Sequence, residues 1–222
     1  MATSLFRPYK VSALYRVHLA LGARWAEEGE WRLPESFAHP EGEVERVRQS
    51  VGLQDVSAIG KLDLKGCDVE RLLAGFALPG VSLFRLRPDH FLLLTLPGRQ
   101  GQVSEVLLHA LSQSPCCAHL TDLTGALSAF ALVGPRAPEL LAKLTSLDLR
   151  SHVFADGVCV QGALAKVPAI IVRQDRGPLP AFSLLLPRDL GEYGWEVIRE
   201  AGENLGLVPF GLAAERLLPG GT

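Results

Sequence analysis

Two segments of the chain share one order of apolar and polar positions. Residues 127–133 (LSAFALV) form a short apolar run typical of a buried strand, and Gly134-Pro135 ends it. Apolar residues then recur at i, i+3, i+4 and i+7, which is one face of a helix: Ala137, Leu140, Leu141 and Leu144. Residues 61–76 repeat the same strand-then-helix order. The pattern therefore predicts an α+β protein with an internal strand–helix duplication.

The remaining periodicity predicts further elements in both halves. Helices are expected over residues 12–22, 41–51, 103–110 and 192–205, and strands over 81–86, 91–96, 169–173 and 182–186. Asp156-Gly157 predicts a hairpin turn between 153–154 and 158–160. Residues 23–40 are less regular. Strand–helix units at both ends of each half favour antiparallel or mixed sheets covered by helices.

Composition narrows the class of protein. Hydrophobic residues make up 48% and charged residues 21%, which predicts a packed globule. The formal charge of −2 gives no electrostatic basis for a nucleic-acid or anionic-membrane partner, and no apolar run reaches the roughly 18 residues of a membrane span. Residues 1–10 lack the apolar region of a secretory signal, so a cytoplasmic protein is expected. The four cysteines form no Cys-x-x-Cys, so no metal site is expected.

Motifs of known mechanism assign no catalytic residue. The chain has no phosphate loop, dinucleotide-binding Gly-x-Gly-x-x-Gly, zincin motif or nucleophile elbow. His18 falls on the apolar face of the first helix, which favours a hydrogen-bonded core histidine over a catalytic one. Asp55 and Ser57 are interpreted as turn-forming residues, with a functional role as the alternative. The aromatics of residues 23–40 anchor that segment or, alternatively, wall a pocket for a flat ligand.

Four stretches, in order along the chain, carry a family resemblance. They are LYRVHLALGAR at 14–24, VGLQDVSAIGK at 51–61, LVGPRA at 132–137 and AGENLGLVPFGL at 201–212. The second is similar to a family's Gly-Leu-Phe-Asp-Val-Ser-His-Met-Gly-Lys, the third to its Leu-Gln-Gly-Pro-Lys-Ala, and the fourth to its Ala-Gly…Gly-Leu-x-Pro-x-Gly-Leu. Together they resemble the folate-dependent aminomethyltransferase family, which includes the T-protein of the glycine cleavage system.

The resemblance implies a two-domain arrangement with tetrahydrofolate in a central channel. Residues 1–56 and 119–222 would form a discontinuous folate-binding-type domain, and residues 57–118 a smaller inserted α+β domain. Ile59 and Phe84 would wall the flat ring, with ordinary core packing as the alternative. Arg173 and Arg216 would meet the glutamate tail of folate, with surface ion pairs as the alternative.

The chain departs from the family where its acidic residues lie. The family's acidic hairpin is missing between residues 82–86 and 90–93, Leu179 stands where a pterin-binding Glu belongs, and Glu215 stands at a basic position. The sequence stops at Thr222, before the family's C-terminal barrel, as in the small γ subunit of heterotetrameric sarcosine oxidase. We therefore expect an aminomethyltransferase-like, tetrahydrofolate-binding-type protein of one-carbon or amine metabolism, degenerate at the catalytic acid. Its partner would be an oxidase subunit or a lipoyl carrier protein. The alternative is a non-catalytic scaffold or assembly subunit that has lost folate.

Overall fold

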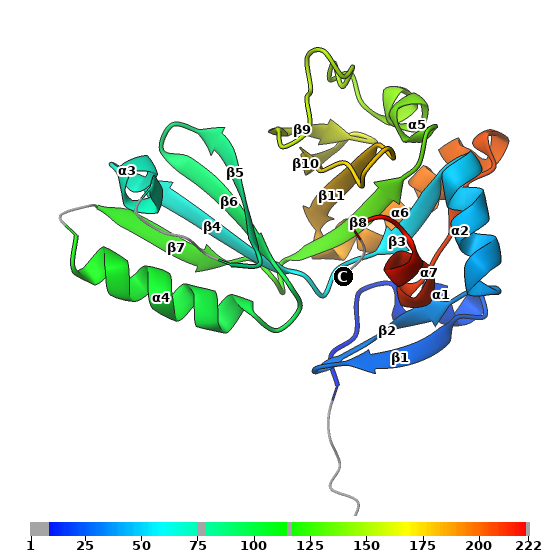
Figure 1. The fold of residues 1–222 in the computed structure, drawn as a ribbon, viewed down its shortest axis with the longest axis horizontal. Coiled ribbons are helices and arrows are strands. Elements are labelled where there is room, and N and C mark those ends of the chain that lie inside the picture. The colour runs from blue at the N-terminus through cyan, green and yellow to red at the C-terminus, as the bar shows by residue number, and fades with distance from the viewer. Residues whose placement is uncertain (1–8, 75–78, 115–116, 221–222) are drawn as a thin grey trace, which may run out of the picture.

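The computed structural model describes residues 9–74, 79–114 and 117–220, whose strands form three sheets (Figure 1). The largest has six strands in the order β12 (Val208–Pro209), β3 (Gly52–Asp55), β8 (Leu127–Val133), β11 (Ala181–Pro187), β10 (Val167–Arg173) and β9 (Cys159–Leu164). Neighbouring strands are antiparallel except β12 and β3, which are parallel.

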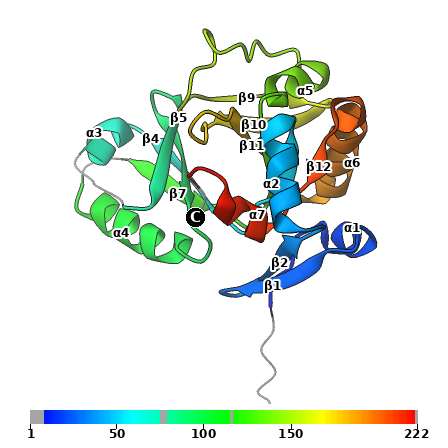
Figure 2. The ribbon, with the colours of Figure 1, turned by 45° about the vertical axis from the view of Figure 1, so that its right-hand side comes forward.

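Alternate residues of β8 face two different cores because successive side chains of a strand point to opposite faces. Phe130 and Leu132 belong to one cluster, closed by α1 (Tyr15–Ala20), α5 (Ala137–Leu144) and α6 (Gly191–Gly202). Ala131 and Val133 belong to the other, closed by α2 (Pro40–Gln49) and α7 (Leu212–Leu217). The six-stranded sheet is thus covered by helices on both faces (Figure 2). Short 3₁₀ turns flank α6, at Arg188–Leu190 and Glu203–Leu205.

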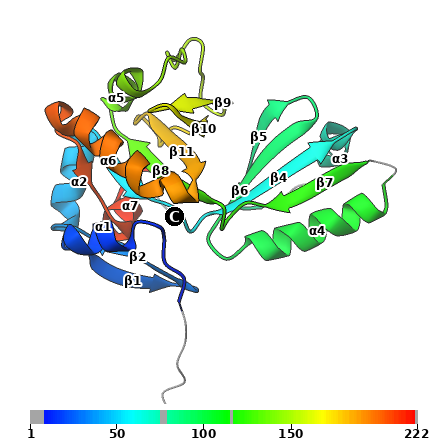
Figure 3. The same cartoon turned by 180° about the vertical axis from the view of Figure 1, so that it is seen from behind.

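The second sheet has four antiparallel strands in the order β5 (Val81–Arg87), β6 (His90–Thr95), β4 (Gly60–Gly66) and β7 (Ala118–Asp122). Phe91 and Leu93 lie in the core that this sheet forms with α3 (Val69–Ala74) and α4 (Gln100–Ser112). Leu92 and Leu94 face the opposite way and pack against residues of the six-stranded sheet, among them Leu185. The two sheets therefore pack face to face, through apolar side chains of β5 and β6 on one side and of β8, β10 and β11 on the other. The view from behind shows the two sheets side by side (Figure 3).

Lys61 ties together the two chain segments that join the sheets. Residues 56–59 lead from β3 to β4, and residues 123–126 lead from β7 to β8. The fully buried Lys61 Nζ donates to the carbonyl oxygens of Ser57 at 2.9 Å, Ile59 at 3.0 Å and Thr124 at 3.2 Å. Burial lowers the pKa of Lys61 to about 8, although the negative charges of Asp55 and Asp122 act to raise it.

The predicted α+β class is confirmed, and so are the strand over 127–133 and the helix that begins near 192. Two local predictions are wrong. Residues 24–36 form a regular hairpin, β1 (Arg24–Glu28) with β2 (Trp31–Ser36), where no regular element was expected. Residues 153–154 are not a strand; the hairpin joins β9 to β10 through Ala165-Lys166, whose φ values of 49° and 69° supply the left-handed backbone such a turn needs.

The smaller sheet extends to Asp122, past the predicted boundary at 118, and the division into domains remains a prediction. Within the described ranges, no helix is both long and apolar enough to cross a bilayer.

Candidate functional site

Two adjoining cavities lie where the sheets meet. The first, of about 390 Å³, is bordered by β8, β11, the end of β6, the loop 174–177 and Gly220. The second, of about 300 Å³, is bordered by β3, by Leu33 of β2, by residues 96–99 and by α7. Four residues line both: Val56, Ile59, Leu96 and Glu215. In Figure 2, α7 and the last described residues lie between the two sheets.

Glu215 is the polar centre of this region. Its Oε1 accepts a hydrogen bond from Arg176 Nη2 at 2.9 Å, and its Oε2 accepts one from Gln54 Nε2 at 2.5 Å. The Arg176 and Glu215 side chains are only 18% and 11% exposed. Arg176 Nη1 and Gln54 Oε1 are buried and have no hydrogen-bond partner among the described residues. The cluster therefore combines satisfied and unsatisfied polar atoms, which is unusual for a buried group.

A second arginine–carboxylate pair lies beside the first cavity. Arg173 donates to both carboxylate oxygens of Asp175, at 3.0 and 2.8 Å, and to the carbonyl oxygen of Phe154 at 2.8 Å. Its hydrogen bond to Asp175 raises the pKa of Arg173. The guanidinium also lies over the Phe182 ring, 5.7 Å from its centroid. Asp175 lines the cavity, whereas Arg173 does not, and each of its three guanidinium nitrogens donates one hydrogen bond.

The structure separates the four residues that the sequence assigned to folate. Ile59 borders both cavities. Phe84 is 3% exposed and packs between the sheets without lining either cavity. Arg173 is held by Asp175, and Arg216 lies on the outer side of α7, 3.3 Å from Glu35 and 3.8 Å from Glu28. Their roles toward a ligand remain predictions.

His18 and Asp55 form a buried pair next to the second cavity. His18 Nε2 lies 2.9 Å from Asp55 Oδ2, and the ring makes an edge contact with Trp195. Asp55 Oδ1 accepts the backbone N–H of Ser57 at 3.0 Å. Burial alone would raise the pKa of Asp55, but His18, with Ser12 and Ser57, holds it below its ordinary value. His18 is thus a buried, hydrogen-bonded histidine and Asp55 bonds the turn at Ser57, as the sequence predicts. The alternative of a functional role for Asp55 and Ser57 remains a prediction, and Asp55 lines the second cavity.

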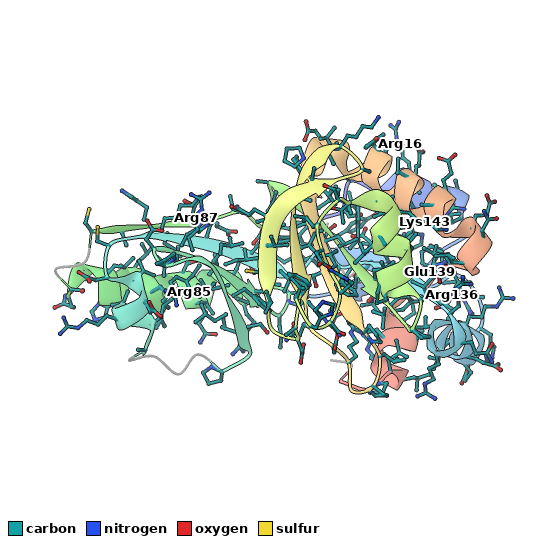
Figure 4. All side chains as sticks on the ribbon, turned by 90° about the horizontal axis from the view of Figure 1, so that it is seen from above. Arg16, Arg85, Arg87, Arg136, Glu139 and Lys143 are labelled. Atoms are coloured by element: carbon teal, nitrogen blue, oxygen red, sulfur yellow. The ribbon has the colours of Figure 1, made fainter. Side chains whose placement is uncertain are left out.

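Several other cations lie on the outside of the molecule, away from the cavities. Figure 4 shows Arg85 and Arg87 on β5, Arg16 on α1, Lys143 on α5 and Arg136 just before α5. Within the described chain, no group of three His, Cys, Asp or Glu side chains is arranged to hold a metal ion.

Sequence reasoning missed the cluster of Gln54, Arg176 and Glu215. It treated Glu215 only as the loss of a basic residue and assigned no role to Arg176. Arg176 and Glu215 carry opposite charges and are 39 residues apart in the sequence. Their side chains are joined by a hydrogen bond, and both residues line the first cavity. Two features of the sequence could have indicated this pair: Glu215 is an acid where the family has a base, and Arg176 had no assigned role.

Comparison with known proteins gives a consistent result. The sequence model of the GCVT N-terminal domain family matches residues 14–83 and 74–219. An aminomethyltransferase of Acidobacterium capsulatum is 29% identical over 98% of this chain and 64% of its own length. One of Moorella thermoacetica is 30% identical over 94% of this chain and 63% of its own length. Sarcosine oxidase subunit alpha of Corynebacterium sp. strain U-96 is 27% identical over 96% of this chain and 26% of its own length. The chain thus spans less than two thirds of these relatives.

Solved structures agree on the fold. The glycine cleavage system aminomethyltransferase T of Bartonella henselae superposes with a TM-score of 0.76 at 20% identity, covering 92% of this chain and 60% of that one. A chain of the heterotetrameric sarcosine oxidase of Corynebacterium sp. U-96 superposes with a TM-score of 0.65 at 20% identity, covering 89% of this chain and 96% of that one. The predicted T-protein fold is confirmed.

Proposed function

Because this chain belongs to the GCVT N-terminal domain family, we propose that it binds a tetrahydrofolate-type ligand in the two cavities beside Ile59. The protein would serve one-carbon or amine metabolism in the cytoplasm, together with a protein partner. It would not complete aminomethyl transfer alone, because the acidic positions that the family resemblance requires are missing from this sequence.

The observation that carries this proposal is the pair of adjoining cavities. Their volumes, about 390 and 300 Å³, are each within the range of small-molecule sites, and their apolar walls are interrupted by a few convergent polar groups. Ile59 and Leu96 would contact the faces of a flat ring. Arg216 would reach the glutamate tail only by giving up its ion pairs with Glu28 and Glu35.

Calorimetric titration with 5-formyltetrahydrofolate tests the proposal. We expect a dissociation constant below about 1 mM. Ser183→Phe would fill the first cavity, since Ser183 lines it from β11, and should abolish the heat of binding. Ser151→Phe makes the same exchange at an exposed loop residue and should bind as the unaltered protein does. Absence of binding by the unaltered protein at millimolar ligand would refute the proposal.

Both carboxylates that line the first cavity, Asp175 and Glu215, are paired with arginines, which favours weak or absent catalysis by this chain alone. With aminomethyl-lipoyl carrier protein and tetrahydrofolate, we expect no ammonia above the level without enzyme. Ammonia release that depends on the chain, and that disappears in Ser183→Phe, would contradict that expectation.

A second candidate is a scaffold or assembly subunit that has lost the ligand. One observation favours it: the superposition with the sarcosine oxidase chain covers 96% of that chain, so a protein of this span is part of a heterotetramer. Affinity capture of the intact protein from its own cells distinguishes the two. A stoichiometric oxidase partner, together with silence in the titration, would favour the scaffold.

A further inference from the structure

We propose that Cys67 and Cys117 form a thiol–disulfide exchange site, at which a small-molecule disulfide oxidises the two thiols to a cross-strand disulfide. The two residues lie at one end of the four-stranded sheet, directly after β4 and directly before β7. Both are exposed, and both are thiols in the structure. Neither borders the two cavities, so the site does not depend on the proposed ligand.

The strand register places the two cysteines opposite each other. The β4–β7 ladder pairs Gly66 with Ala118, and the next pair along it is Cys67 with Cys117. The backbone N–H of Cys67 donates to the carbonyl oxygen of Cys117 at 3.1 Å, so the pairing continues past the last residue of each strand. Opposite residues that share such a bond have Cα atoms about 5.5 Å apart, and disulfides join Cα atoms about 4.4–6.8 Å apart. The backbone spacing therefore fits a disulfide.

Gly66 allows the two strand ends to approach this closely. A Cβ on Gly66 would lie 2.2 Å from the carbonyl oxygen of Cys117 and 2.4 Å from the Cα of Ala118, so a side chain at this position would not fit. Cys67 is followed by Asp68 at a φ of 60°, where the chain leaves the sheet toward α3. The glycine and this turn together hold Cys67 at the end of the strand, beside Cys117.

Cys159 lies apart from this site. It belongs to β9 of the six-stranded sheet, and its Sγ donates to the carbonyl oxygen of Arg85 at 3.2 Å. Arg85 is on β5, the opposite edge of the four-stranded sheet from β7. Burial raises the pKa of Cys159 to about 11, and the thiolate is the nucleophile in disulfide exchange, so Cys159 reacts slowly at neutral pH.

The exchange proceeds in two balanced steps, with glutathione disulfide as the oxidant. One cysteine thiolate attacks a sulfur of glutathione disulfide, whose S–S bond breaks; a mixed disulfide forms and one glutathione leaves as a thiolate. The second cysteine thiolate then attacks the protein sulfur of the mixed disulfide and releases the second glutathione. The two cysteines lose two electrons, which glutathione disulfide gains. The two protons of the cysteine thiols are transferred to the two glutathione thiolates.

The disulfide would close a loop that runs from residue 67 to residue 117 and contains α3, β5, β6 and α4. It would join β7, an edge strand, covalently to β4. A cross-link of this kind restricts the unfolded chain, so oxidation should raise the urea concentration at which the protein unfolds. Reduction with dithiothreitol should reverse the change.

Treatment of the native protein with glutathione disulfide tests the inference. We expect the unaltered protein to lose two alkylatable thiols and the mass of two hydrogen atoms, and a peptide digest to link Cys67 to Cys117. In Cys117→Ser the mixed disulfide on Cys67 has no attacking thiol opposite it, so it should persist at least about tenfold longer. Cys116→Ser is the matched control, because it removes the adjacent cysteine in the sequence, and it should form the disulfide as the unaltered protein does.

The urea midpoint provides the second measurement. It should rise on oxidation of the unaltered protein and of Cys116→Ser, and stay the same for Cys117→Ser. A digest that links Cys116 to either of the other two cysteines would overturn the inference, and so would an internal disulfide that still forms in Cys117→Ser. Glutathione adducts that accumulate on the unaltered protein without a cross-link would overturn it as well.

Discussion

Replacing Lys61 with Met tests how the two sheets are held together. The Met side chain keeps most of the aliphatic stem and removes the ammonium group, so three buried carbonyl oxygens lose their donor. Hydrogen bonds to a charged group contribute about 1.5–3 kcal/mol each, which gives a gross loss of about 4–9 kcal/mol.

Part of this loss is offset because the variant no longer buries a charge. The pKa of Lys61 falls from 10.5 to about 8, and the difference of about 2.5 units corresponds to about 3.5 kcal/mol at 1.4 kcal/mol per unit. The net expectation is therefore a decrease of about 1–5 kcal/mol in the free energy of unfolding at pH 7. Equilibrium unfolding in urea measures it.

The matched control is Lys65→Met, on the same strand but exposed and paired with Asp63. Its effect should stay within about 0.5 kcal/mol. A loss below about 1 kcal/mol for Lys61→Met would refute the reasoning, because the three bonds would then contribute no more than a surface contact.

The pH dependence supplies an independent readout. The folded pKa of Lys61 lies below the unfolded one, so between about pH 8 and 10.5 the unfolded chain binds more protons and stability from this group rises with pH. The free energy difference between the unaltered protein and Lys61→Met should widen by about 2 kcal/mol from pH 8 to pH 10. A constant difference would show that Lys61 is not desolvated as described.

Three further changes follow from local geometry and charge. Gly134→Ala places a Cβ 2.4 Å from the carbonyl oxygen of Ser50 at a φ of +130°, and thermal unfolding should show a loss of about 2–4 kcal/mol; an unchanged Tm would contradict this. The pKa of Asp55 in the folded protein lies below 3.8, so its carboxylate contributes stability above about pH 4 that is lost on further acidification. Asp55→Asn should therefore reduce the dependence of the free energy of unfolding on pH between about pH 5 and 2. An unchanged slope would count against the His18 contact. Burial raises the pKa of Cys159 to about 11, so iodoacetamide at pH 8 should alkylate it on the order of a hundredfold more slowly than free cysteine. Peptide mass spectrometry measures the rate, and a rate comparable to that of free cysteine would refute its burial.

The parts of the fold that the sequence predicted are those with strong local signals. The strand over 127–133 is apolar except for Ser128 and ends at Gly134-Pro135, so its burial on both faces could be inferred from the run itself. The helix of 191–202 repeats its apolar positions and ends in a turn closed by Gly206 at a φ of +70°. In both cases the local preference and the tertiary environment agree.

The errors arise where that agreement is missing. The hairpin of 24–36 contains Pro34 and several charges, and its regularity comes from pairing across the turn rather than from an alternating sequence. The turn at Ala165-Lys166 has no glycine or asparagine to announce its left-handed backbone. Asp156-Gly157 has that composition, yet it closes a loop. Turn chemistry at these positions is set by the strands that flank it.

The candidate site was less predictable than the fold because its members are brought together only by tertiary contacts. Ile59 was named as a wall residue and does border both cavities. Arg216 was named as a ligand contact, but it forms ion pairs with Glu28 and Glu35. The side chain of the neighbouring Glu215 points in a different direction, because adjacent helical residues are separated by about 100° around the axis.

The hydrogen bond between Gln54 and Glu215 joins positions that are 161 residues apart. Glu215 and its donor Arg176 lie in the second half of the polypeptide, whereas its donor Gln54 lies in the first, so neither half expressed alone contains all three residues. Recombination between homologous genes with a crossover inside that interval would inherit the three side chains from different parents. A chimera with such a crossover therefore keeps this hydrogen bond only if its two parents carry compatible residues at both positions.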